Sequence, residues 1–315
     1  MKLKDSILQA LEENRESAIS GQALASRFGV SRNAVWKAVN ALREEGIAIE
    51  STQNRGHKLS PAYDRVTVSG LQALMGTQGV AVHCLALVDS TNNQAKRLMV
   101  AGEAAPFLVV AEQQTAGRGR QGRTFYSPPQ AGLYMTLALG IGQLAEDALG
   151  VTAFAAVAVA EAVYAVCGVK TSIKWVNDLF YQGKKVCGIL TEATTDLETG
   201  TMESLLIGIG LNLRESDVPQ ELRDVVGHLG CAGAVKNRLA AEITARLLAY
   251  QPLSTAHLAA YRAHSLTLGQ RVVCQSGGVS IEGLAEDIDT NGALLVRDAT
   301  GLLHTVRSGE VRPAP

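Results

Sequence analysis

Arginine and glycine alternate in one short stretch of the sequence, residues 117–123, which holds three of each. Arginine keeps its positive charge and offers a planar set of donors that fits a carboxylate or a phosphate. Glycine lets the main chain adopt positive φ angles and approach a ligand closely. A solvated surface loop or a nucleic-acid-binding segment can have the same composition. Because the stretch follows the apolar run 106–111 inside a long globular region, we favour a mobile loop that clamps an anion.

Two polar clusters carry further groups that suit a small ligand. Residues 89–92, Asp-Ser-Thr-Asn, separate the β-like run 82–88 from a helical pattern at 94–99. Such a junction exposes main-chain N–H groups and hydroxyls at a sheet edge, although the same residues could simply cap the helix. Residues 174–178, Lys-Trp-Val-Asn-Asp, bring a lysine and a carboxylate together.

Glycine also recurs inside two β-like runs, residues 185–192 and 205–212. Strands normally avoid glycine, so its presence suggests that a ligand or another backbone lies close. Strands and helices alternate over residues 66–265. The tight glycine turns between neighbouring strands predict a mixed or antiparallel sheet in an α+β domain rather than a doubly wound one.

Residues 1–62 have the pattern of a winged helix-turn-helix domain. A short helix is predicted at 20–25, and Ser31 is a good N-cap for a third helix over 32–45, which two short strands follow. Polar side chains on this helix and on the strands would contact DNA. The candidate DNA-binding residues are Arg32, Asn33, Trp36, Lys37, Arg43, Arg55 and Lys58.

The charge of this N-terminal region is small. Residues 1–60 hold nine basic and seven acidic side chains, a net charge of +2. DNA binding is favoured, while a winged helix used for protein contacts or regulation stays open. Trp36 could equally belong to the core of the domain.

Composition limits the class of protein. A chain of 315 residues with 47% hydrophobic residues is expected to form two or three domains. With a net charge of −1, the chain is not a strongly basic protein that binds nucleic acid through its overall charge. Any DNA binding must therefore come from a local patch. The five cysteines form no CxxC pair or Cys/His cluster, which argues against a structural zinc site and fits a reducing cytoplasm.

No membrane segment is expected. The N-terminus has no apolar signal-peptide core. The most hydrophobic window, residues 151–169, is rich in alanine and carries Glu161 in its middle, which favours a buried core helix.

The rest of the chain completes a three-domain prediction. Pro61 marks a linker, because proline continues neither a helix nor a ladder. Short β-like runs separated by glycine turns predict a small all-β barrel from residue 266 onward. The predicted domains are residues 1–62, 66–265 and 266–315.

Taken in order, these motifs resemble those of biotin–protein ligases. The likeness lies in the clusters at 89–92 and 174–178, in Gln114-x-Ala-Gly-Arg-Gly-Arg-x-Gly-Arg, in Lys185-x-x-Gly-Ile-Leu and in Gly208-x-Gly-x-Asn. With the winged helix, the chain resembles the bifunctional bacterial form, which also represses biotin biosynthesis genes. The resemblance covers essentially the whole chain. It implies a class II synthetase-like ligase domain and an SH3-like C-terminal barrel.

The resemblance also implies the reaction and its partners. Biotin and ATP, with Mg²⁺, give biotinyl-5′-adenylate and pyrophosphate. The adenylate then acylates one lysine of the biotin carboxyl carrier protein of acetyl-CoA carboxylase. The adenylate-bound protein would form a homodimer that binds operator DNA. Fixed positive charges suit this chemistry, because the biotin carboxylate and the α-phosphate repel each other.

Residue roles follow from the matching motif positions. The resemblance assigns Arg118, Arg120, Lys185 and Asp178 to catalysis. It assigns biotin binding to Ser90, Thr91, Asn92, Gln114, Arg118, Gly119, Arg120, Lys185, Gly188, Leu190, Gly208 and Gly210. It assigns ATP or adenylate binding to Arg118, Arg120, Arg123, Phe125, Lys174, Asn177 and Asn212. No metal site made of protein alone is expected, because Mg²⁺ would arrive with ATP.

One departure and three rival hypotheses remain. Phe125 stands where the family often has a tryptophan that covers the adenine, so weaker cover is expected. The chain could be a ligase whose N-terminal domain does not bind DNA. It could be a lipoate ligase or another acyl-adenylating enzyme of the same fold, although the arginine–glycine loop favours biotin. It could also be a transcription factor that only senses a ligand.

Overall fold

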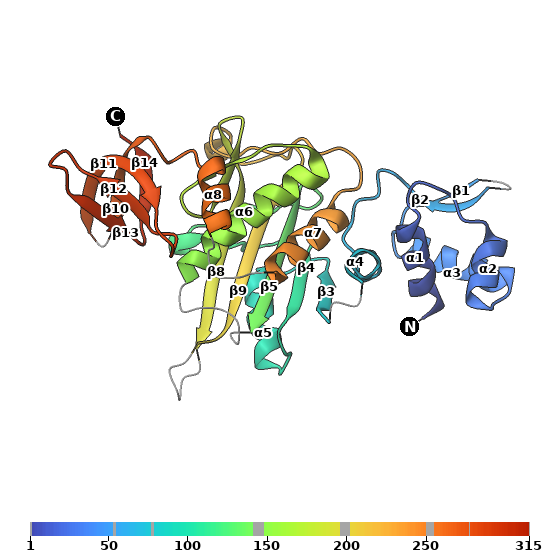
Figure 1. Cartoon of the computed structure of the whole chain (residues 1–315). Coiled ribbons are helices and arrows are strands. Elements are labelled where there is room, and N and C mark those ends of the chain that lie inside the picture. The colour runs from blue at the N-terminus through green and yellow to red at the C-terminus, as the bar shows by residue number, and fades with distance from the viewer. Residues whose placement is uncertain are drawn as a thin grey trace.

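The computed structural model of the chain has three units in a row (Figure 1). The N-terminal helices and the C-terminal strands lie at opposite ends of a larger unit built on a central sheet. The structure describes residues 2–52, 55–76, 79–140, 148–195, 202–249, 255–276 and 278–314. The predicted order of winged helix, mixed-sheet unit and small β unit is confirmed. We propose to retain the predicted domain limits, residues 1–62, 66–265 and 266–315.

The N-terminal unit is the predicted winged helix-turn-helix. Ser31 caps the third helix by accepting a main-chain N–H, and Gly29 ends the second at a φ of 64°. Val35, Val39 and Leu42 are buried in the core of this unit, so the polar side chains of the third helix face outward. The elements are α1 (Leu3–Glu13), α2 (Gly21–Phe28), α3 (Arg32–Glu44), β1 (Ile49–Thr52) and β2 (Gly56–Leu59).

The central unit holds a mixed sheet of seven strands in the order β3-β4-β5-β9-β8-β7-β6. Among the described strands, β3 and β4 run parallel, and every other neighbouring pair runs antiparallel. The α+β class is therefore as predicted. The strands are β3 (Ala81–Leu85), β4 (Phe107–Ala111), β5 (Gly132–Gly140), β6 (Ser172–Lys174), β7 (Asp178–Tyr181), β8 (Lys184–Thr195) and β9 (Met202–Asn212).

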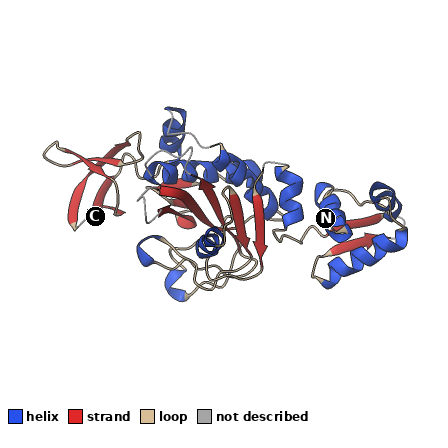
Figure 2. Cartoon of the chain, turned by 90° about the horizontal axis from the view of Figure 1, so that it is seen from below, coloured by secondary structure: helices blue, strands red, loops and turns tan. Residues whose placement is uncertain are grey.

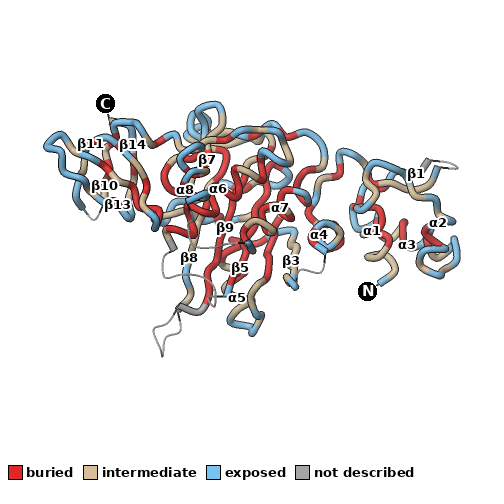
Figure 3. The backbone as a smooth tube through the Cα atoms, in the orientation of Figure 1, coloured by how far each residue is buried: buried red, intermediate tan, exposed pale blue. Residues whose placement is uncertain are grey.

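Helices cover the two faces of this sheet unequally (Figure 2). Four helices, α4, α6, α7 and α8, share the largest apolar core with one face, and strands β5 and β9 beneath them are drawn mostly as buried in Figure 3. On the other face α5 packs on β4, β5 and β9 around a smaller core. That face therefore has room for a ligand beside α5. The helices are α4 (Val68–Met75), α5 (Thr91–Val100), α6 (Ala148–Cys167), α7 (Lys236–Leu248) and α8 (Thr255–His264), with short 3-10 helices at Arg120–Gly122 and Gln220–Leu222.

Helix α6 is a core helix, as predicted. By length and composition its segment Leu149–Cys167 could cross a membrane, but 72% of that window is buried inside the protein. The Thr152 hydroxyl donates to Thr191 Oγ1 of β8 (2.9 Å), and Glu161 pairs with Arg246 of α7. These contacts fix α6 between the sheet and α7.

Direct contacts join the winged helix and the predicted linker to the central unit. Helix α4, which the sequence patterns did not predict, packs against α1 and α7. Glu12 of α1 accepts a hydrogen bond from Asn237 Nδ2 of α7 (3.2 Å). Asp64 pairs with Arg214 beyond the end of β9 and accepts from Lys236 N (2.8 Å). The winged helix is thus connected to the central unit by buried polar contacts as well as by the chain.

The C-terminal unit is a five-stranded antiparallel sheet in the order β13-β12-β11-β10-β14. Its apolar core is continuous with that of the central unit. Trp175 is buried between the two and donates from Nε1 to Gly292 O (2.9 Å) and from its main chain to Thr267 Oγ1 (3.0 Å). The strands are β10 (Arg271–Ser276), β11 (Val279–Ile288), β12 (Leu294–Arg297), β13 (Leu303–Val306) and β14 (Glu310–Pro313).

Candidate functional site

One cavity, of about 170 Å³, brings nearly all the predicted ligand-binding residues together. It lies over β8 and β9, beside the start of α5 and against the arginine–glycine loop. The exception is Asn212, which lines a second cavity of about 900 Å³ together with Tyr126 and Arg214. The predicted residues that line the first cavity are Ser90, Thr91, Asn92, Gln114, Arg118, Gly119, Arg120, Arg123, Phe125, Lys174, Asn177, Asp178, Lys185, Gly188, Leu190, Gly208 and Gly210.

The floor of the cavity is made by the glycines of β8 and β9. Gly188 lies opposite Gly210 in the ladder, and a methyl group on Gly210 would overlap the Phe125 ring. A methyl group on Gly208 would overlap the Asn92 amide. The glycines of β8 and β9 therefore mark a close approach of other groups, as the sequence indicated. The close groups are side chains of the chain itself, which form the cavity walls.

Buried polar side chains bond to one another at one end of the cavity. Thr136 of β5 donates to Asn92 Oδ1 (2.6 Å) and lies 2.8 Å from Thr91 Oγ1. Gln114 accepts from Thr91 N (2.8 Å) and donates to Ser127 Oγ (2.8 Å). Thr136 was not predicted, although a threonine among the largely apolar residues of β5 was a usable signal. The network holds donors and acceptors in fixed orientations, as recognition of a polar group requires.

The arginine–glycine loop forms a tight turn at the cavity mouth. Gly119 N donates to Arg123 O (2.7 Å), and Phe125 N donates to Gly117 O (2.8 Å). A side chain at Gly117 would overlap Phe125 O, and Gly122 has a φ of 73°. These glycines are required by the turn itself.

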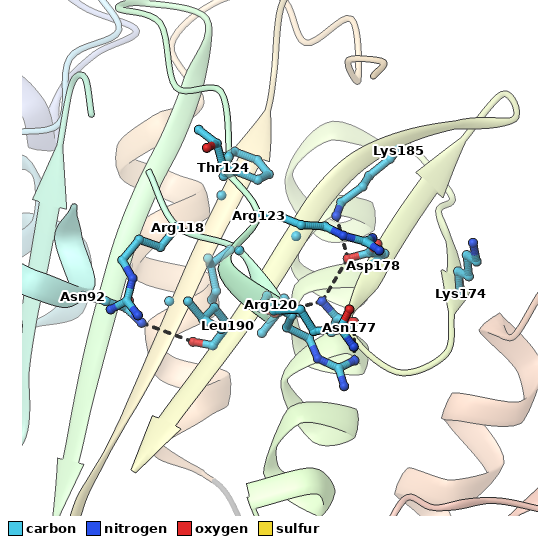
Figure 4. Close-up of a pocket in the computed structure, with 18 of the residues that line it drawn as sticks. Asn92, Arg118, Arg120, Arg123, Thr124, Lys174, Asn177, Asp178, Lys185 and Leu190 are labelled. Atoms are coloured by element: carbon cyan, nitrogen blue, oxygen red, sulfur yellow. Dashed lines mark hydrogen bonds and ion pairs between the residues drawn. The ribbon is translucent and has the colours of Figure 1, made fainter. Parts of the chain in front are cut away.

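Arg118 and Arg120 point to opposite sides of the cavity (Figure 4). Arg118 Nη1 donates to Asn93 Oδ1 (3.1 Å) and pairs with Glu192 Oε1 (3.1 Å). Arg120 Nη1 donates to Asn177 Oδ1 (3.0 Å). The two arginines therefore divide the cavity into a hydrogen-bonded polar end and a separate cationic end.

The cationic end gathers Arg120, Lys185, Asn177 and Asp178 (Figure 4). Lys185 Nζ lies 2.8 Å from Asp178 Oδ1, and Asn177 Nδ2 donates to the same oxygen (2.9 Å). Burial lowers the pKa of the Arg120 guanidinium, and the Asp178 charge acts in the opposite direction. The guanidine group is so strong a base that Arg120 stays protonated and positively charged at neutral pH. Two cations beside one carboxylate leave positive charge available for an anionic ligand.

The C-terminal sheet contributes residues that the sequence patterns missed. Gly309, Glu310 and Val311 of the β14 region line the cavity, and Arg123 Nη2 donates to Glu310 Oε2 (2.8 Å). Hydrogen bonds from Arg312 and Arg123 hold the pKa of the Glu310 carboxyl below its usual value. No local motif could have placed a contact across 187 positions of sequence.

Two predicted nucleotide-binding residues differ in how they are placed. Lys174 lies apart from the cationic cluster in Figure 4, with its Nζ 5.9 Å from the centre of the Phe180 ring. Phe125 lies over Gly188 and Gly210, edge-on to Tyr134 with ring centres 6.5 Å apart. Phe125 is therefore packed against the glycines of β8 and β9, whereas Lys174 lines the cavity apart from the cationic cluster.

The predicted DNA-binding side chains lie far from this cavity, on the N-terminal unit (Figure 1). Arg32, Asn33, Trp36 and Lys37 are exposed on α3, and Trp36, at 57% exposed, is not a core residue. Arg55 is exposed and Lys58 is half-buried. Arg43 instead donates twice to Ile49 O (3.2 and 3.0 Å) and also to Ser51 Oγ. It connects β1 to α3, and DNA binding by Arg43 stays a prediction.

Three family models match the chain. Residues 84–212 match the biotin/lipoate A/B protein ligase family. Residues 4–58 match an HTH domain, and residues 267–312 match the biotin protein ligase C-terminal domain. The matched order is that of the three units in the structure.

Two bacterial relatives match the chain along nearly its whole length. The chain is 30% identical over 312 residues to the bifunctional ligase/repressor BirA of Bacillus subtilis, covering 95% of each chain. It is 29% identical over 303 residues to BirA of Escherichia coli, covering 93% of this chain and 92% of that one. A solved biotin protein ligase from Aquifex aeolicus, in complex with biotin and ATP, is similar with a TM-score of 0.64 and 26% identity, over 74% of this chain and 99% of that chain.

Proposed function

The chain belongs to the family of bifunctional biotin–protein ligases and repressors, and from this premise we propose how its residues perform each activity. As a ligase it joins biotin to ATP, giving biotinyl-5′-adenylate and pyrophosphate, and passes biotin to acetyl-CoA carboxylase. As a repressor it binds DNA through its winged helix. The observation that carries the proposal is one cavity with a hydrogen-bonded polar end, a cationic end and an arginine–glycine loop at its mouth.

Biotin would enter at the polar end. Its ureido group needs both donors and acceptors, which the network around Asn92, Thr91 and Gln114 supplies, with Ser90 beside it. Leu190 and the glycine floor would accept the apolar ring and chain. The biotin carboxylate would then point toward the cationic end.

The cationic end would bring the carboxylate and the α-phosphate together. The two anions repel, and fixed positive charges offset that repulsion and stabilise the charge that develops on phosphorus. Arg120 and Lys185 are held in place by Asn177 and Asp178. Because these groups are already positioned, little reorganisation is needed during the reaction. Phe125 would cover the adenine, with Asn212 binding it from the neighbouring cavity.

Mg²⁺ would enter bound to ATP. No group of three or more metal-binding side chains occurs among the described residues. Asp178 and Glu310 are the carboxylates that line the cavity, and both are ion-paired. A Mg²⁺ ion commonly keeps most of its ligands from phosphates and water and takes one or two carboxylates from protein. Asp178 fits that role, and it could also orient the lysine that receives biotin.

The loop would protect the adenylate. A mixed anhydride hydrolyses readily, so a site that excludes water retains it. Residues 117–123 cover the mouth of the cavity, and their glycines permit the turn to open and close.

The repressor activity would use the exposed face of α3. Arg32, Asn33, Trp36 and Lys37 are free to enter a major groove, while Arg55 and Lys58 flank them on the wing. We propose that adenylate binding promotes a homodimer whose two winged helices bind a palindromic operator. A gel shift with the operator of biotin biosynthesis genes tests this. A gel shift that shows no adenylate-dependent binding to the operator would leave the ligase-only alternative.

The acceptor of biotin would be one lysine of the biotin carboxyl carrier protein, and the protein would work in the cytoplasm. Both proposals rest on the ligase family and on the free cysteines, which suit a reducing compartment.

Biotin-dependent pyrophosphate release is the decisive test of the ligase site. We expect release from the unmodified protein and a strong loss in Arg118→Ala and in Lys185→Ala. Unchanged rates in both variants would overturn the assignment of these residues. Binding of biotin without pyrophosphate release would indicate a sensor rather than an enzyme.

A further inference from the structure

Glu192 lies on β8 immediately beyond the cavity wall. Alternate residues of a strand share one face, so Glu192 faces the same side as Gly188 and Leu190. In the ladder Leu190 pairs with Gly208, and Glu192 pairs with Leu206 two residues further along. Of the described residues, those that line the cavity do not include Glu192. Any effect on a ligand must therefore pass through its neighbours.

Three donors from two other segments converge on this one carboxylate. Asn92 Nδ2 donates to Glu192 Oε2 (2.8 Å) and Lys96 Nζ donates to Oε1 (2.9 Å), both from α5. Arg118 of the loop pairs with Oε1 (3.1 Å). The Glu192 side chain is only 18% exposed, whereas Lys96 and Arg118 are 38% and 42% exposed. The carboxylate is thus the buried centre, and the two cations lie at its solvent side.

The carboxylate is held in its ionised form. Burial acts to raise the pKa of Glu192, but hydrogen bonds from Asn92 and Lys96, together with the Arg118 charge, hold it below the usual value. Glu192 therefore keeps its negative charge at neutral pH and accepts from all three partners at once.

Through Asn92 the contact continues across the cavity. The Asn92 amide donates to Glu192 and to Leu190 O (3.4 Å). Its carbonyl oxygen is therefore turned toward the Thr136 hydroxyl, from which it accepts a hydrogen bond. From there the network already described runs through Thr91 and Gln114 to Ser127, whose hydroxyl donates to Phe125 O (3.0 Å). The arginine–glycine loop is therefore connected to this network at Arg118, through Glu192, and at Phe125, two residues beyond the loop.

We propose that Glu192 is a positioning residue that fixes the Asn92 amide at the biotin end of the cavity and anchors Arg118 so that the loop stays closed over the adenylate. This inference rests on the proposed ligase site. Its partners make different demands, because Asn92 needs an acceptor, whereas Arg118 and Lys96 need a negative charge.

Two substitutions separate these demands. Glu192→Gln keeps an acceptor for Asn92 and removes the charge that holds Arg118. We expect its affinity for biotin without ATP to stay within about 3-fold of the unmodified protein, since a neutral hydrogen bond replaces a charged one. Release of bound adenylate should become roughly 10-fold faster, the factor typical of losing one charge-assisted contact. Glu192→Ala removes both contacts, so biotin affinity should also fall, by roughly 10-fold or more.

The experiment first measures biotin-dependent pyrophosphate release by the unmodified protein. Absence of that activity overturns the ligase proposal rather than this one. Labelled biotin and Mg·ATP then load each variant, and an excess of unlabelled biotin reveals the rate of adenylate release. Biotin binding without ATP is measured separately by calorimetry. Glu242→Gln is the matched control, because Glu242 pairs with Arg246 on the outer side of α7, away from the cavity, and should change neither quantity.

A split between the two Glu192 variants supports a positioning role, with faster adenylate release in both and weaker biotin binding in Glu192→Ala alone. Wild-type release rates in both variants would overturn the proposal. Equal losses of biotin affinity in both variants, in parallel with lowered melting temperatures, would also overturn it, since they would indicate a purely structural carboxylate.

Discussion

Two positively charged surfaces of this chain are prepared for their ligands in opposite ways. At the cavity, Arg118, Arg120 and Arg123 each bind a partner on a different part of the protein. On α3, the side chains of Arg32 and Lys37 are exposed and make no hydrogen bond or ion pair with the described part of the chain. The cavity arginines are held in position before a ligand binds, whereas the basic side chains of α3 remain available to pair with a ligand.

The difference follows from the size and chemistry of what each surface binds. Adenylation requires charges placed against a few atoms, and preorganised groups stabilise the transition state best. A DNA backbone presents many phosphates along a groove, and flexible basic side chains gain affinity by displacing its counterions. Substitutions in the cavity should therefore affect rate by large factors, whereas those on α3 should affect affinity by smaller, salt-dependent steps.

Arg120→Ala should have the largest effect. Arg120 is half-buried and fixed by Asn177, so its loss removes a prepositioned charge from the reacting groups. We expect pyrophosphate release to slow by about 100- to 1,000-fold, the range found when one preorganised stabilising group is removed. Stopped-flow measurement at saturating biotin and ATP gives the rate.

Arg246→Ala serves as the control for Arg120→Ala. Arg246 is an arginine paired with Glu161 and Glu242 on α6 and α7, so it tests loss of an ion-paired arginine outside the cavity. Its adenylation rate should match that of the unmodified protein. An Arg120→Ala rate within threefold of the control would remove the distinction between the two surfaces.

Joint replacement of Arg32 and Lys37 by alanine should affect DNA alone. Neither side chain contributes to the fold, so adenylation and thermal stability should be unchanged. Operator affinity should fall by roughly 10-fold or more, and the slope of its dependence on salt should decrease by about 2 if both contact phosphate. Fluorescence anisotropy at several salt concentrations measures both quantities. An unchanged slope would show that these side chains do not contact the backbone.

Arg43→Ala tests a residue that was predicted with the DNA-binding group but is bonded inside the domain. Loss of its donors leaves Ile49 O without partners between α3 and β1. We expect the winged helix to lose about 1–2 kcal/mol of stability, the range for removing a part-buried hydrogen bond to a charged group. Denaturant unfolding followed at Trp36 reports this unit. A stable variant with weakened operator binding would return Arg43 to the phosphate-contacting group.

The sequence predicted those features that depend on neighbouring residues. The cap at Ser31 and the spacing of Val35, Val39 and Leu42 were enough to orient α3. The glycines at 208 and 210 indicated a close approach over β9, because a glycine inside a strand weakens it and commonly marks a place where another group comes near. For the cavity, all but one of the ligand-binding positions that the motifs selected line it, although other lining residues were not selected.

Features that depend on packing between distant segments were not predictable in this way. Glu310 enters the cavity because the C-terminal sheet packs against Trp175, and nothing in its own neighbourhood indicates that contact. Arg43 has the same type and spacing as a phosphate-binding residue, and only the position of β1 reveals its partner. Glu192 is intermediate, since it ends the predicted strand at residues 185–192, but nothing in the sequence identifies its donors.

The smallest predicted effect concerns pH and lies at the wing. Burial, and to a lesser extent the Arg43 charge, lowers the pKa of His57 below its ordinary value of about 6.5. The unfolded chain therefore binds a proton more readily than the folded one. Stability is fully present above about pH 6.5 and declines as the pH falls toward the lowered pKa of the folded state. The decline between pH 7.5 and 5.5 should be small, because His57 is only half-buried and water screens its charge.

His57→Gln should flatten this part of the pH profile while Arg43→Ala should flatten it only in part. Both follow from the order of causes, since burial persists when the neighbouring charge is removed. Unfolding of the full chain at the two pH values, followed at the exposed Trp36, gives the three slopes. A His57→Gln profile as steep as that of the unmodified protein would assign the proton uptake to another group. The wing would then not be the pH-sensitive part of the DNA-binding surface, and the charges of α3 would operate independently of it.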